Sequence, residues 1–554
     1  MKKEFLFLLY GLFFVSMGVA QIAPNKYYIQ FTDKKNSPYS LDHPEQFLTK
    51  RALARRARFR IPIKENDLPV NPQYVDSVAK TGVKILNTSR WLNGVTVYTT
   101  HPELLDSIRK FSFVKNVLKF APAGRQQKDK FKKERLLPVG RNISFKAATI
   151  SEAQYGAALT QIKQLNGMYL HEKGFRGSGM VIAVLDAGFS HVLTQPLFDS
   201  LINDHRLLGT KDFVLPGGDV YPPHYHGRMV LSCMAADAPG LMVGTAPRAS
   251  YWLLRSEDVS SENVIEEYNW VSAAEFADSV GADIINSSLG YIAFDDPAFS
   301  HPYSDMNGKT CISTKGAEIA ASKGILVVNS AGNDGQNAVF PWIGAPADGD
   351  SVLTVGAVTA TGVRASFSSI GPTYDGRIKP TLMAMGQLDA VADATDSVVR
   401  ASGTSFSSPV LAGMCACLWE AHPDATNMQI IEVLKKTASL TDHPNNYMGW
   451  GIPDFVKADS CLTQLLQIRH SKSIMAWPNP FFDKFSIEIP QNISGEVVVT
   501  LFSAEGREVF SKVYPVEQNQ LLVSGASLAH LPQGVYVIKV SGNGSVSYGK
   551  VVKR

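Results

Sequence analysis

The sequence predicts an α/β protein with a mainly parallel sheet covered by helices on both faces, preceded by a small α+β domain and followed by a β-sandwich. Three observations lead to this prediction. Apolar runs of strand length alternate with helical patterns through the middle of the chain, shorter strands and helices precede them, and alternating strands punctuated by glycine follow them. At 554 residues, the chain is also too long for a single hydrophobic core.

The chain begins with the layout of a secretory signal peptide, which we expect to occupy residues 1–20. Lys2 and Lys3 precede an apolar run over residues 5–15, and small residues end that run. The run is too short to span a membrane comfortably, and no later segment approaches about 18 unbroken apolar residues. We therefore expect an exported protein without a transmembrane anchor.

The small α+β domain is predicted from short strands and helices that follow the signal peptide. We expect strands at 26–31 and 113–118, a basic helix at 45–58 and a second helix opened by Pro102. A charged run over residues 125–135 comes next, and no aromatic ladder accompanies its lysines. Because the formal net charge is only +4, we interpret this run as a solvated, cleavable linker and expect no nucleic-acid partner.

The middle of the chain carries five apolar strands bounded by glycine or turn residues. These strands are expected at 180–185, 251–254, 283–286, 325–329 and 352–355, with helices at 263–279 and 314–323. Continuous apolar strands interleaved with helices indicate a parallel sheet covered on both faces. Ligands bind to such a sheet at the carboxyl ends of its strands.

Four polar side chains stand where such a sheet would hold a ligand. Asp186 and Asn333 follow strands, His226 begins an apolar helix, and Ser405 begins the helix that runs to Trp419. Free N–H groups at a helix N-terminus favour negative charge that forms beside Ser405. We expect Pro409 to lie in the first turn of that helix, where its missing N–H costs nothing.

These four residue types are the ones that acyl transfer requires. A serine needs a base to remove its proton, and histidine, with a reference pKa of about 6.5, suits that role. A carboxylate behind the imidazole fixes its tautomer, and the Asn333 side chain and the Ser405 backbone N–H are candidate donors to the oxyanion. The order Asp, His, Ser along the chain is the order found in subtilisin.

The segment from about Tyr155 to Leu466 resembles the subtilisin-like serine peptidases, or subtilases. Six short motifs in the family's order carry the resemblance, at residues 184–188, 226–227, 244–247, 286–290, 331–333 and 403–409. The resemblance implies a serine endopeptidase with Asp186, His226 and Ser405 as its triad and Asn333 as its oxyanion donor. It also implies that the substrate backbone pairs with extended edges formed by Ser288, Leu289, Gly290, Ala331 and Gly332.

Two positions depart from the subtilase pattern. Ala187 stands where the family commonly has Thr or Ser, so one polar partner of Asp186 is absent. Arg228 stands where the family usually has Thr. Neither change removes a catalytic group, so we expect altered tuning of an active enzyme. A catalytically silent adhesin that keeps the fold for binding is the alternative from another class.

The two flanking domains carry resemblances of their own. Residues 26–121 resemble the inhibitory propeptides of subtilases, which implies a zymogen whose first partner is its own propeptide. The C-terminal strands, expected at 485–489, 497–502, 534–540 and 550–553, resemble the sorting domain of type IX secretion cargo, on the strength of Pro-Asn-Pro-Phe at 478–481, Gly-Val-Tyr at 534–536 and the basic end. That resemblance implies export through the periplasm of a Gram-negative bacterium to the cell surface or medium. An ordinary carbohydrate- or protein-binding β-module is the alternative.

No metal or cofactor is assigned from the sequence. His224 has no third ligand at a characteristic spacing, and Tyr303 occupies the position where a phosphate loop ending at Gly308–Thr310 needs its first glycine. Subtilases often bind calcium, but no Asp/Asn cluster here has diagnostic spacing, so we name no ligands. We expect five parts: signal peptide 1–20, propeptide with basic linker 21–140, catalytic domain 141–466, linker 467–472 and sorting domain 473–554.

Overall fold

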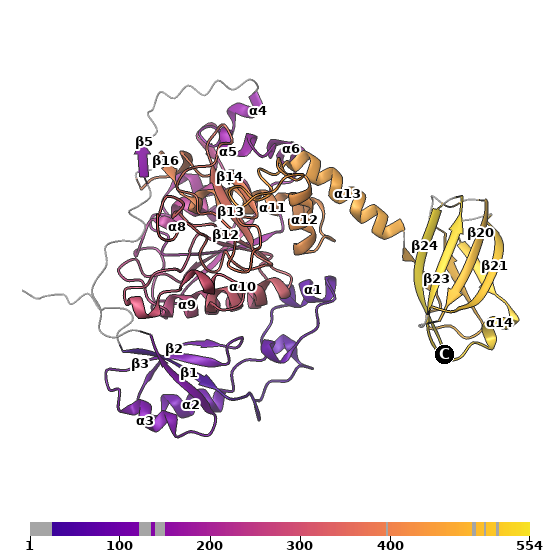
Figure 1. Ribbon diagram of the computed structural model, residues 1–554, viewed down its shortest axis with the longest axis horizontal. Coiled ribbons are helices and arrows are strands. Elements are labelled where there is room, and N and C mark those ends of the chain that lie inside the picture. The colour runs from indigo at the N-terminus through magenta and orange to yellow at the C-terminus, as the bar shows by residue number, and fades with distance from the viewer. Residues whose placement is uncertain are drawn as a thin grey trace, which may run out of the picture. The chain divides into compact units, whose positions relative to one another are not determined.

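The computed structural model describes residues 25–120, 135–138, 150–394, 397–471, 473–489, 493, 495–503, 506–516, 520–543 and 545–554. The expected signal peptide and most of the expected basic linker lie outside these residues. The chain divides into two compact units, one of Met1–Ala421 with Thr426–Phe455 and one of His422–Ala425 with Val456–Arg554 (Figure 1).

A seven-stranded, wholly parallel sheet forms the centre of the first unit. In spatial order its strands are β14 (Leu382–Met385), β13 (Leu353–Val358), β12 (Leu326–Ser330), β11 (Ile284–Ser287), β6 (Val181–Asp186), β10 (Ser250–Arg255) and β7 (Leu207–Asp212). Every residue of the five strands from β14 to β6 is buried, which is why those strands are continuous apolar runs in the sequence.

Two layers of helices cover this sheet, as the sequence predicts. Helices α9 (Ile265–Val280) and α10 (Ile312–Ser322) pack on one face, against inward side chains such as Leu185, Ile285 and Val327 (Figure 1). Helices α8 (His226–Ala235) and α11 (Thr404–Ala421) lie on the opposite face. The predicted strands and helices of this region are found with ends shifted by one to three residues. Two edge strands of the sheet were not predicted. Gly209 and Lys211 interrupt the apolar pattern of the exposed β7, and the buried β14 is only four residues long.

The N-terminal part of the first unit is a four-stranded antiparallel sheet in the order β2 (Lys84–Ser89), β3 (Gly94–Tyr98), β1 (Lys26–Phe31) and β4 (Val114–Lys119), with helices α2 (Pro72–Ala79) and α3 (Leu104–Arg109). This is the predicted α+β domain. The helix predicted at 45–58 is wrong in its first half. Pro44–Gln46 is a short 3-10 helix, and α1 (Lys50–Arg58) starts afresh where the Thr49 hydroxyl accepts a hydrogen bond from Ala52 N at 3.3 Å.

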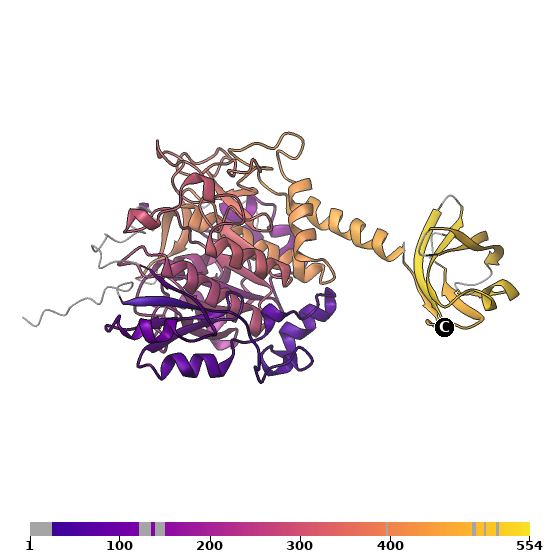
Figure 2. The same ribbon diagram turned by 60° about the horizontal axis from the view of Figure 1, so that its bottom comes forward.

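The N-terminal sheet packs against α9 of the central domain (Figures 1 and 2). Glu275 of α9 accepts hydrogen bonds from the backbone N–H groups of Arg90 and Trp91, at 2.8 and 3.1 Å, and from the Ser89 hydroxyl at 2.5 Å. At the end of the same helix, the buried Asp278 forms ion pairs with three arginines of the N-terminal domain, Arg55, Arg56 and Arg90. The contact between the two domains therefore includes a buried, directional network of hydrogen bonds and ion pairs beside an apolar cluster of Tyr28 and Phe120 with Tyr268.

Several short elements complete the first unit. They are β5 (Arg135–Pro138), α4 (Ile150–Ala153), α5 (Leu159–Lys163), α6 (Met168–Glu172), α7 (Asp199–Asn203), β8 (Asp237–Ala238), β9 (Met242–Val243), β15 (Asp389–Ala392), β16 (Val398–Ser402), α12 (Asn427–Lys436) and the 3-10 helices η2 (Glu65–Asp67), η4 (Pro196–Phe198), η5 (Pro297–Phe299) and η6 (Tyr303–Asp305). Strands β15, β16 and β5 form a separate three-stranded antiparallel sheet just before Ser405.

The second unit contains α13 (Phe455–Ser471) and a β-sandwich. One sheet has the order β17 (Ser473–Ile474), β24 (Ser545–Lys553), β23 (Gly534–Gly542), β20 (Gly495–Phe502), β21 (Glu508–Val516), and the other has β18 (Ala476–Trp477), β19 (Lys484–Glu488), β22 (Gln520–Ser524), with the short helix α14 (Ala526–Ala529) after β22. Phe481, Phe485, Leu501 and Val540 are among the core residues that the two sheets share. The stretch expected as a linker, 467–472, is helical as far as Ser471, because α13 continues through it. Within the described residues, no helix is both long and apolar enough to cross a membrane.

Candidate active site

Asp186 and His226 form a buried hydrogen-bonded pair. Asp186 is the last residue of β6, and His226 is the first residue of α8, so both stand at the carboxyl edge of the sheet. His226 Nδ1 donates to Asp186 Oδ1 at 2.7 Å, and both side chains are fully buried. The backbone N–H of Ala187 donates to the same oxygen at 2.7 Å. These bonds fix the tautomer and the orientation of the imidazole.

The second oxygen of this carboxylate has no donor. Asp186 Oδ2 is buried without a hydrogen-bond partner among the described residues, and the methyl side chain of Ala187 provides none. The other departure from the family pattern has a local role. Arg228 donates to the backbone oxygen and the hydroxyl of Ser190, at 3.0 and 3.2 Å, and so ties α8 to the loop after β6.

Ser405 is the second residue of α11 and is only 4% exposed. The expectation for Pro409 needs correction: the helix already begins at Thr404, so Pro409 lies one turn inside it. A proline there leaves the carbonyl oxygen of Ser405 without its helical N–H partner. The Ser288 hydroxyl replaces that partner, donating to the Ser405 carbonyl oxygen at 2.8 Å.

Asn333 is held by the residue that precedes the serine. Its Oδ1 accepts hydrogen bonds from the backbone N–H and the hydroxyl of Thr404, at 2.9 and 3.0 Å. With Oδ1 fixed in this way, the Nδ2 end is the end that can donate to a substrate oxygen. Gly332 before it adopts a φ of 103°, in the left-handed region that favours glycine, and an added Cβ would lie 2.8 Å from the Ser369 hydroxyl oxygen.

One pocket of about 160 Å³ brings most of the predicted site residues together. Its lining includes Ser405 and Asn333 with all five predicted substrate-binding residues, Ser288, Leu289, Gly290, Ala331 and Gly332. The ring of His226 lies beside this segment, since its centroid is 6.1 Å from that of Phe406, the residue after Ser405. The predicted residues thus gather at one edge of the sheet.

The pocket also contains residues that sequence reasoning missed. They are Glu257, Glu262, Ile292, Asp334, Gly344 and Thr404. Glu257 lies just beyond the end of β10. It could therefore have been predicted from the rule that ligands bind at the carboxyl ends of parallel strands. Gly344 and Ile292 carry no chemistry-bearing group, and only the folded chain brings them to the pocket.

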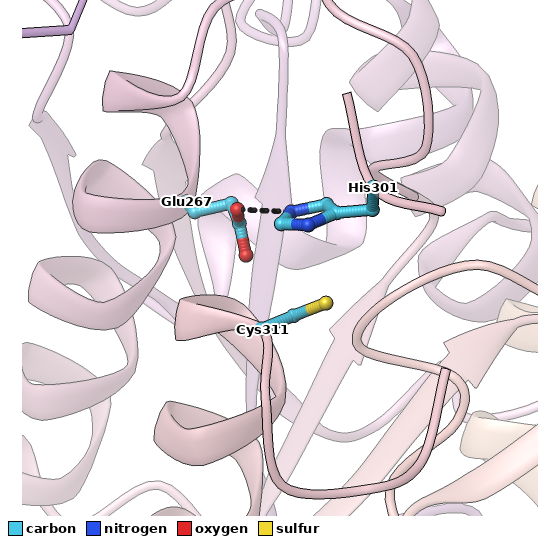
Figure 3. A group of neighbouring side chains, drawn as sticks. All are labelled: Glu267, His301 and Cys311. Carbon is cyan, nitrogen blue, oxygen red and sulfur yellow. Dashed lines mark hydrogen bonds and ion pairs between the residues drawn. The ribbon is translucent and has the colours of Figure 1, made fainter. Parts of the chain in front are cut away.

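Two groups of side chains lie close enough to hold a metal ion: Glu267, His301 and Cys311, and Glu257, Glu262 and Glu266. In the first group (Figure 3), Glu267 accepts a hydrogen bond from His301 Nε2 at 2.8 Å. Asp305 accepts one from His301 Nδ1 at 3.2 Å. Burial opposes the charged imidazole, but these two carboxylates outweigh it and raise the pKa of His301. Charge pairing therefore accounts for the contact between His301 and Glu267, which fastens the loop at His301 to α9. His224 Nδ1 accepts a hydrogen bond from His226 N at 3.2 Å, so His224 supports the start of α8.

Sequence comparisons agree with this geometry. A model of the Subtilase family matches residues 177–451. Subtilisin NAT of Bacillus subtilis subsp. natto is 30% identical over 294 residues, which cover 52% of this chain and 68% of that protein. Subtilisin of Bacillus pumilus is 30% identical over 281 residues, which cover 50% of this chain and 90% of that protein. The chain belongs to the subtilase family.

The flanking domains of this subtilase match family models too. A peptidase S8 propeptide domain of Bacteroidota matches residues 26–135, and a secretion system C-terminal sorting domain matches residues 475–554. Among solved structures, MycP1 from the ESX-1 type VII secretion system aligns with a TM-score of 0.45 and 21% identity, over 60% of this chain and 90% of that one. The matches to family models show a serine endopeptidase with a propeptide and a type IX sorting domain, exported by a Gram-negative bacterium.

Proposed function

We propose that this subtilase cleaves peptide bonds through an acyl-enzyme on Ser405, with His226 as general base and Asp186 as the orienting carboxylate. The buried hydrogen bond of 2.7 Å between His226 Nδ1 and Asp186 carries the proposal. It keeps the proton on Nδ1, which makes Nε2 the nitrogen that accepts the serine proton. It also stabilises the imidazolium that forms when that proton arrives.

The reaction follows from these assignments. Ser405 Oγ attacks the substrate carbonyl carbon as His226 takes its proton, and Asn333 Nδ2 and the Ser405 backbone N–H donate to the oxyanion. His226 then gives the proton to the leaving amine, and the acyl-enzyme forms. A water molecule attacks the ester in the second half of the reaction, with His226 again acting first as base and then as acid.

Substrate backbone is proposed to pair with the edges at Ser288, Leu289, Gly290, Ala331 and Gly332. Their shared position in one pocket with Ser405 supports this role. Protein or peptide chains are the substrates, because an extended peptide adds to such edges by main-chain hydrogen bonds. No metal ion is required by these steps.

The chain is proposed to be a zymogen that removes its own propeptide, with the propeptide and its basic linker in residues 21–140, the catalytic domain in 141–466 and the sorting domain in 473–554. The contact of the N-terminal domain with α9 supports inhibition by a segment that stays bound until it is cut. The match to a propeptide domain, which ends at residue 135, supports a junction in the charged run.

Single substitutions test these roles. Ser405→Ala and His226→Ala should each lower kcat by about 10⁶-fold, which is the effect of removing the triad serine or histidine in subtilisin. Asn333→Ala should cost less, about 10²- to 10³-fold. Each variant should keep the circular dichroism spectrum of the wild type. Near-normal peptide hydrolysis by Ser405→Ala would contradict the assignment of Ser405 as the nucleophile.

A further inference from the structure

The substrate pocket beside Ser405 is acidic. Glu257, Glu262 and Asp334 line it, and no lysine, arginine or histidine is found among the described residues of its lining. Glu266 adds a fourth carboxylate, because its oxygen lies within 4.8 Å of those of Glu257 and Glu262. Carboxylates gathered in this way stabilise a cation that binds among them. The proposal that this pocket belongs to the active site does not depend on these charges, since Ser405 and Asn333 belong to the same lining.

Local structure holds the three acidic residues in place. The Tyr291 hydroxyl donates a hydrogen bond to Glu257. The backbone N–H of Glu262 donates to Asp295 at 3.1 Å, and that of Asp334 donates to the Ser369 hydroxyl at 3.0 Å. The carboxylates are therefore carried by an ordered frame, which preorganises their charge for a ligand.

Apolar walls complete the pocket. Leu289, Ile292 and Ala331 line it together with the three acidic residues. A lysine or arginine side chain matches this combination, because its methylene stem packs on apolar surface while its charged end reaches carboxylates. A leucine or phenylalanine would use the walls but bring no positive charge to the carboxylates.

A segment with basic side chains precedes strand β5, which pairs with the strand just before Ser405. Strand β5 runs antiparallel to β16, with Arg135 opposite Ser402 and Pro138 opposite Val399. The N-terminal end of β5 is thus the end nearest Ser405, which lies three residues after Ser402. An extended chain advances about 3.3 Å per residue, so a few residues span the length of chain between Ser402 and Ser405.

The sequence just before β5 is rich in lysine. Lys128, Lys130, Lys132 and Lys133 precede Glu134 and Arg135. These four lysines lie outside the described residues, and the register of β5 begins shortly after them, at Arg135. The propeptide match ends at the same place, at residue 135.

We propose that the pocket selects substrates with a lysine or arginine on the N-terminal side of the cleaved bond, and that the first such substrate is the lysine-rich segment 128–134 of the same chain. Glu257, Glu262 and Asp334 are the residues that set this selectivity. The inference rests on the proposed function, since it gives that peptidase a substrate class.

A positional peptide library tests the selectivity. Purified mature enzyme is given fluorogenic peptides in which each of the four positions before the cleaved bond carries Lys, Arg, Leu, Phe or Glu in turn. We expect kcat/KM to be at least about tenfold higher for Lys or Arg than for Leu or Phe at one position, which corresponds to about 1.4 kcal/mol. A preference for Leu or Phe over Lys and Arg at all four positions would overturn the inference while leaving the peptidase assignment intact. Loss of all hydrolysis, together with no labelling by a fluorophosphonate, would contradict the proposed function instead.

Charge-neutral variants test the named residues. Glu262→Gln and Asp334→Asn should each lower the ratio of kcat/KM for the Lys peptide to that for the matched Leu peptide by about five- to tenfold. Glu432→Gln is the matched control, because Glu432 is exposed on α12 and pairs with Lys435 outside the pocket. An unchanged ratio in both pocket variants would refute the assignment of these carboxylates.

The mature N-terminus tests the second half of the proposal. Intact-mass and N-terminal sequencing should place the new terminus at residues 129–135 in the wild type, whereas Ser405→Ala precursor made in a protease-free system should stay uncut. Replacing Lys128, Lys130, Lys132 and Lys133 together by leucine should slow self-cleavage by at least about tenfold. A terminus outside 129–135, or self-cleavage at the wild-type rate in the leucine variant, would exclude this segment as the first substrate.

Discussion

The Ser288 hydroxyl donates a hydrogen bond of 2.8 Å to the carbonyl oxygen of Ser405. This bond satisfies an oxygen that Pro409 deprives of its helical partner, inside a helix whose first sixteen residues are all buried. It also connects a proposed substrate-binding edge to the proposed nucleophile. One side chain therefore fixes both the first turn of α11 and the wall of the pocket.

Ser288→Ala should damage catalysis through this connection. The variant leaves a buried carbonyl oxygen without a donor, at a cost of about 1–3 kcal/mol, and lets the first turn of α11 shift. We expect kcat to fall about tenfold or more while KM changes less than threefold, because the backbone of residue 288 still offers its edge to the substrate. Steady-state kinetics measure both constants.

Ser322→Ala is the matched control for Ser288→Ala. The Ser322 hydroxyl also donates to a backbone oxygen, that of Ile319 at 2.7 Å, but it is exposed on α10. This control should leave both constants within twofold of the wild type. Equal effects of the two substitutions would show that the Ser288 bond has no special role.

Asp278 should matter more to the precursor than to the mature enzyme. It is fully buried and pairs with Arg55, Arg56 and Arg90, all of which belong to the N-terminal domain. Asp278→Asn leaves three buried guanidinium groups facing a neutral side chain, and breaking a buried pair in this way costs about 3–5 kcal/mol. We expect a large fall in the melting temperature of the Ser405→Ala precursor.

The mature form supplies the comparison for Asp278→Asn. Once the N-terminal domain has left, the partner arginines are absent, so the same substitution should change the melting temperature of inhibitor-blocked mature enzyme by much less. Differential scanning calorimetry on both forms measures the difference. An equal loss in the two forms would mean that Asp278 does not act through the propeptide contact.

Asp389 should make stability depend on pH. It is fully buried in β15, neither carboxylate oxygen has a partner among the described residues, and burial raises its pKa to about 8 against the pull of Arg400. Since the folded-state pKa lies above the unfolded value, the stabilising contribution of the neutral acid is complete below about pH 4. It is lost progressively as the pH rises through about 8.

Asp389→Asn removes this titration while keeping the shape of the side chain. In the Ser405→Ala background, which prevents self-digestion, urea unfolding at pH 5 and pH 8 should give a smaller difference in unfolding free energy for the Asn variant than for the parent. The Asn variant should also be the more stable of the two at pH 8. The same pH dependence with and without the substitution would contradict the account of Asp389.

The sorting domain should be separable from the chemistry. All four proposed catalytic residues lie in the first unit, whereas the β-sandwich belongs to the second. Removing residues 473–554 should leave an active peptidase after refolding in vitro, and should hold the protein in the periplasm of its native host. Fractionation of that host with an activity assay measures the outcome. Normal export of the truncated chain would contradict the sorting role.

The sequence was most informative where chemistry and periodicity coincide. Asp186, His226, Asn333 and Ser405 could be proposed as site residues because each is a polar side chain after a strand or at the start of a helix, and most of the buried strands could be predicted because they are uninterrupted apolar runs. The edge strand β7 and the break at Thr49 follow from solvent exposure and local capping, which hydrophobic periodicity does not record.

The features that the sequence analysis did not predict depend on contacts between distant segments. Glu257 and Glu262 reach the pocket from the loop after β10, and the Ser288 bond depends on where Pro409 falls in α11. The arginines that surround Asp278 are about 190 to 220 residues away in the sequence. Each of these side chains can be read from the sequence. Which of them are in contact cannot, because their contacts arise only when distant segments pack together.

Labelling with a fluorophosphonate tests the central claim most directly, because the probe forms a covalent bond only with an activated serine. Wild-type mature enzyme is treated with the probe, digested and mapped by mass spectrometry, alongside His226→Ala and Ser405→Ala. The account predicts one modified residue, Ser405, in the wild type, with labelling lost in Ser405→Ala and slowed by several orders of magnitude in His226→Ala. Modification of a different serine, or undiminished labelling of Ser405 in His226→Ala, would contradict it.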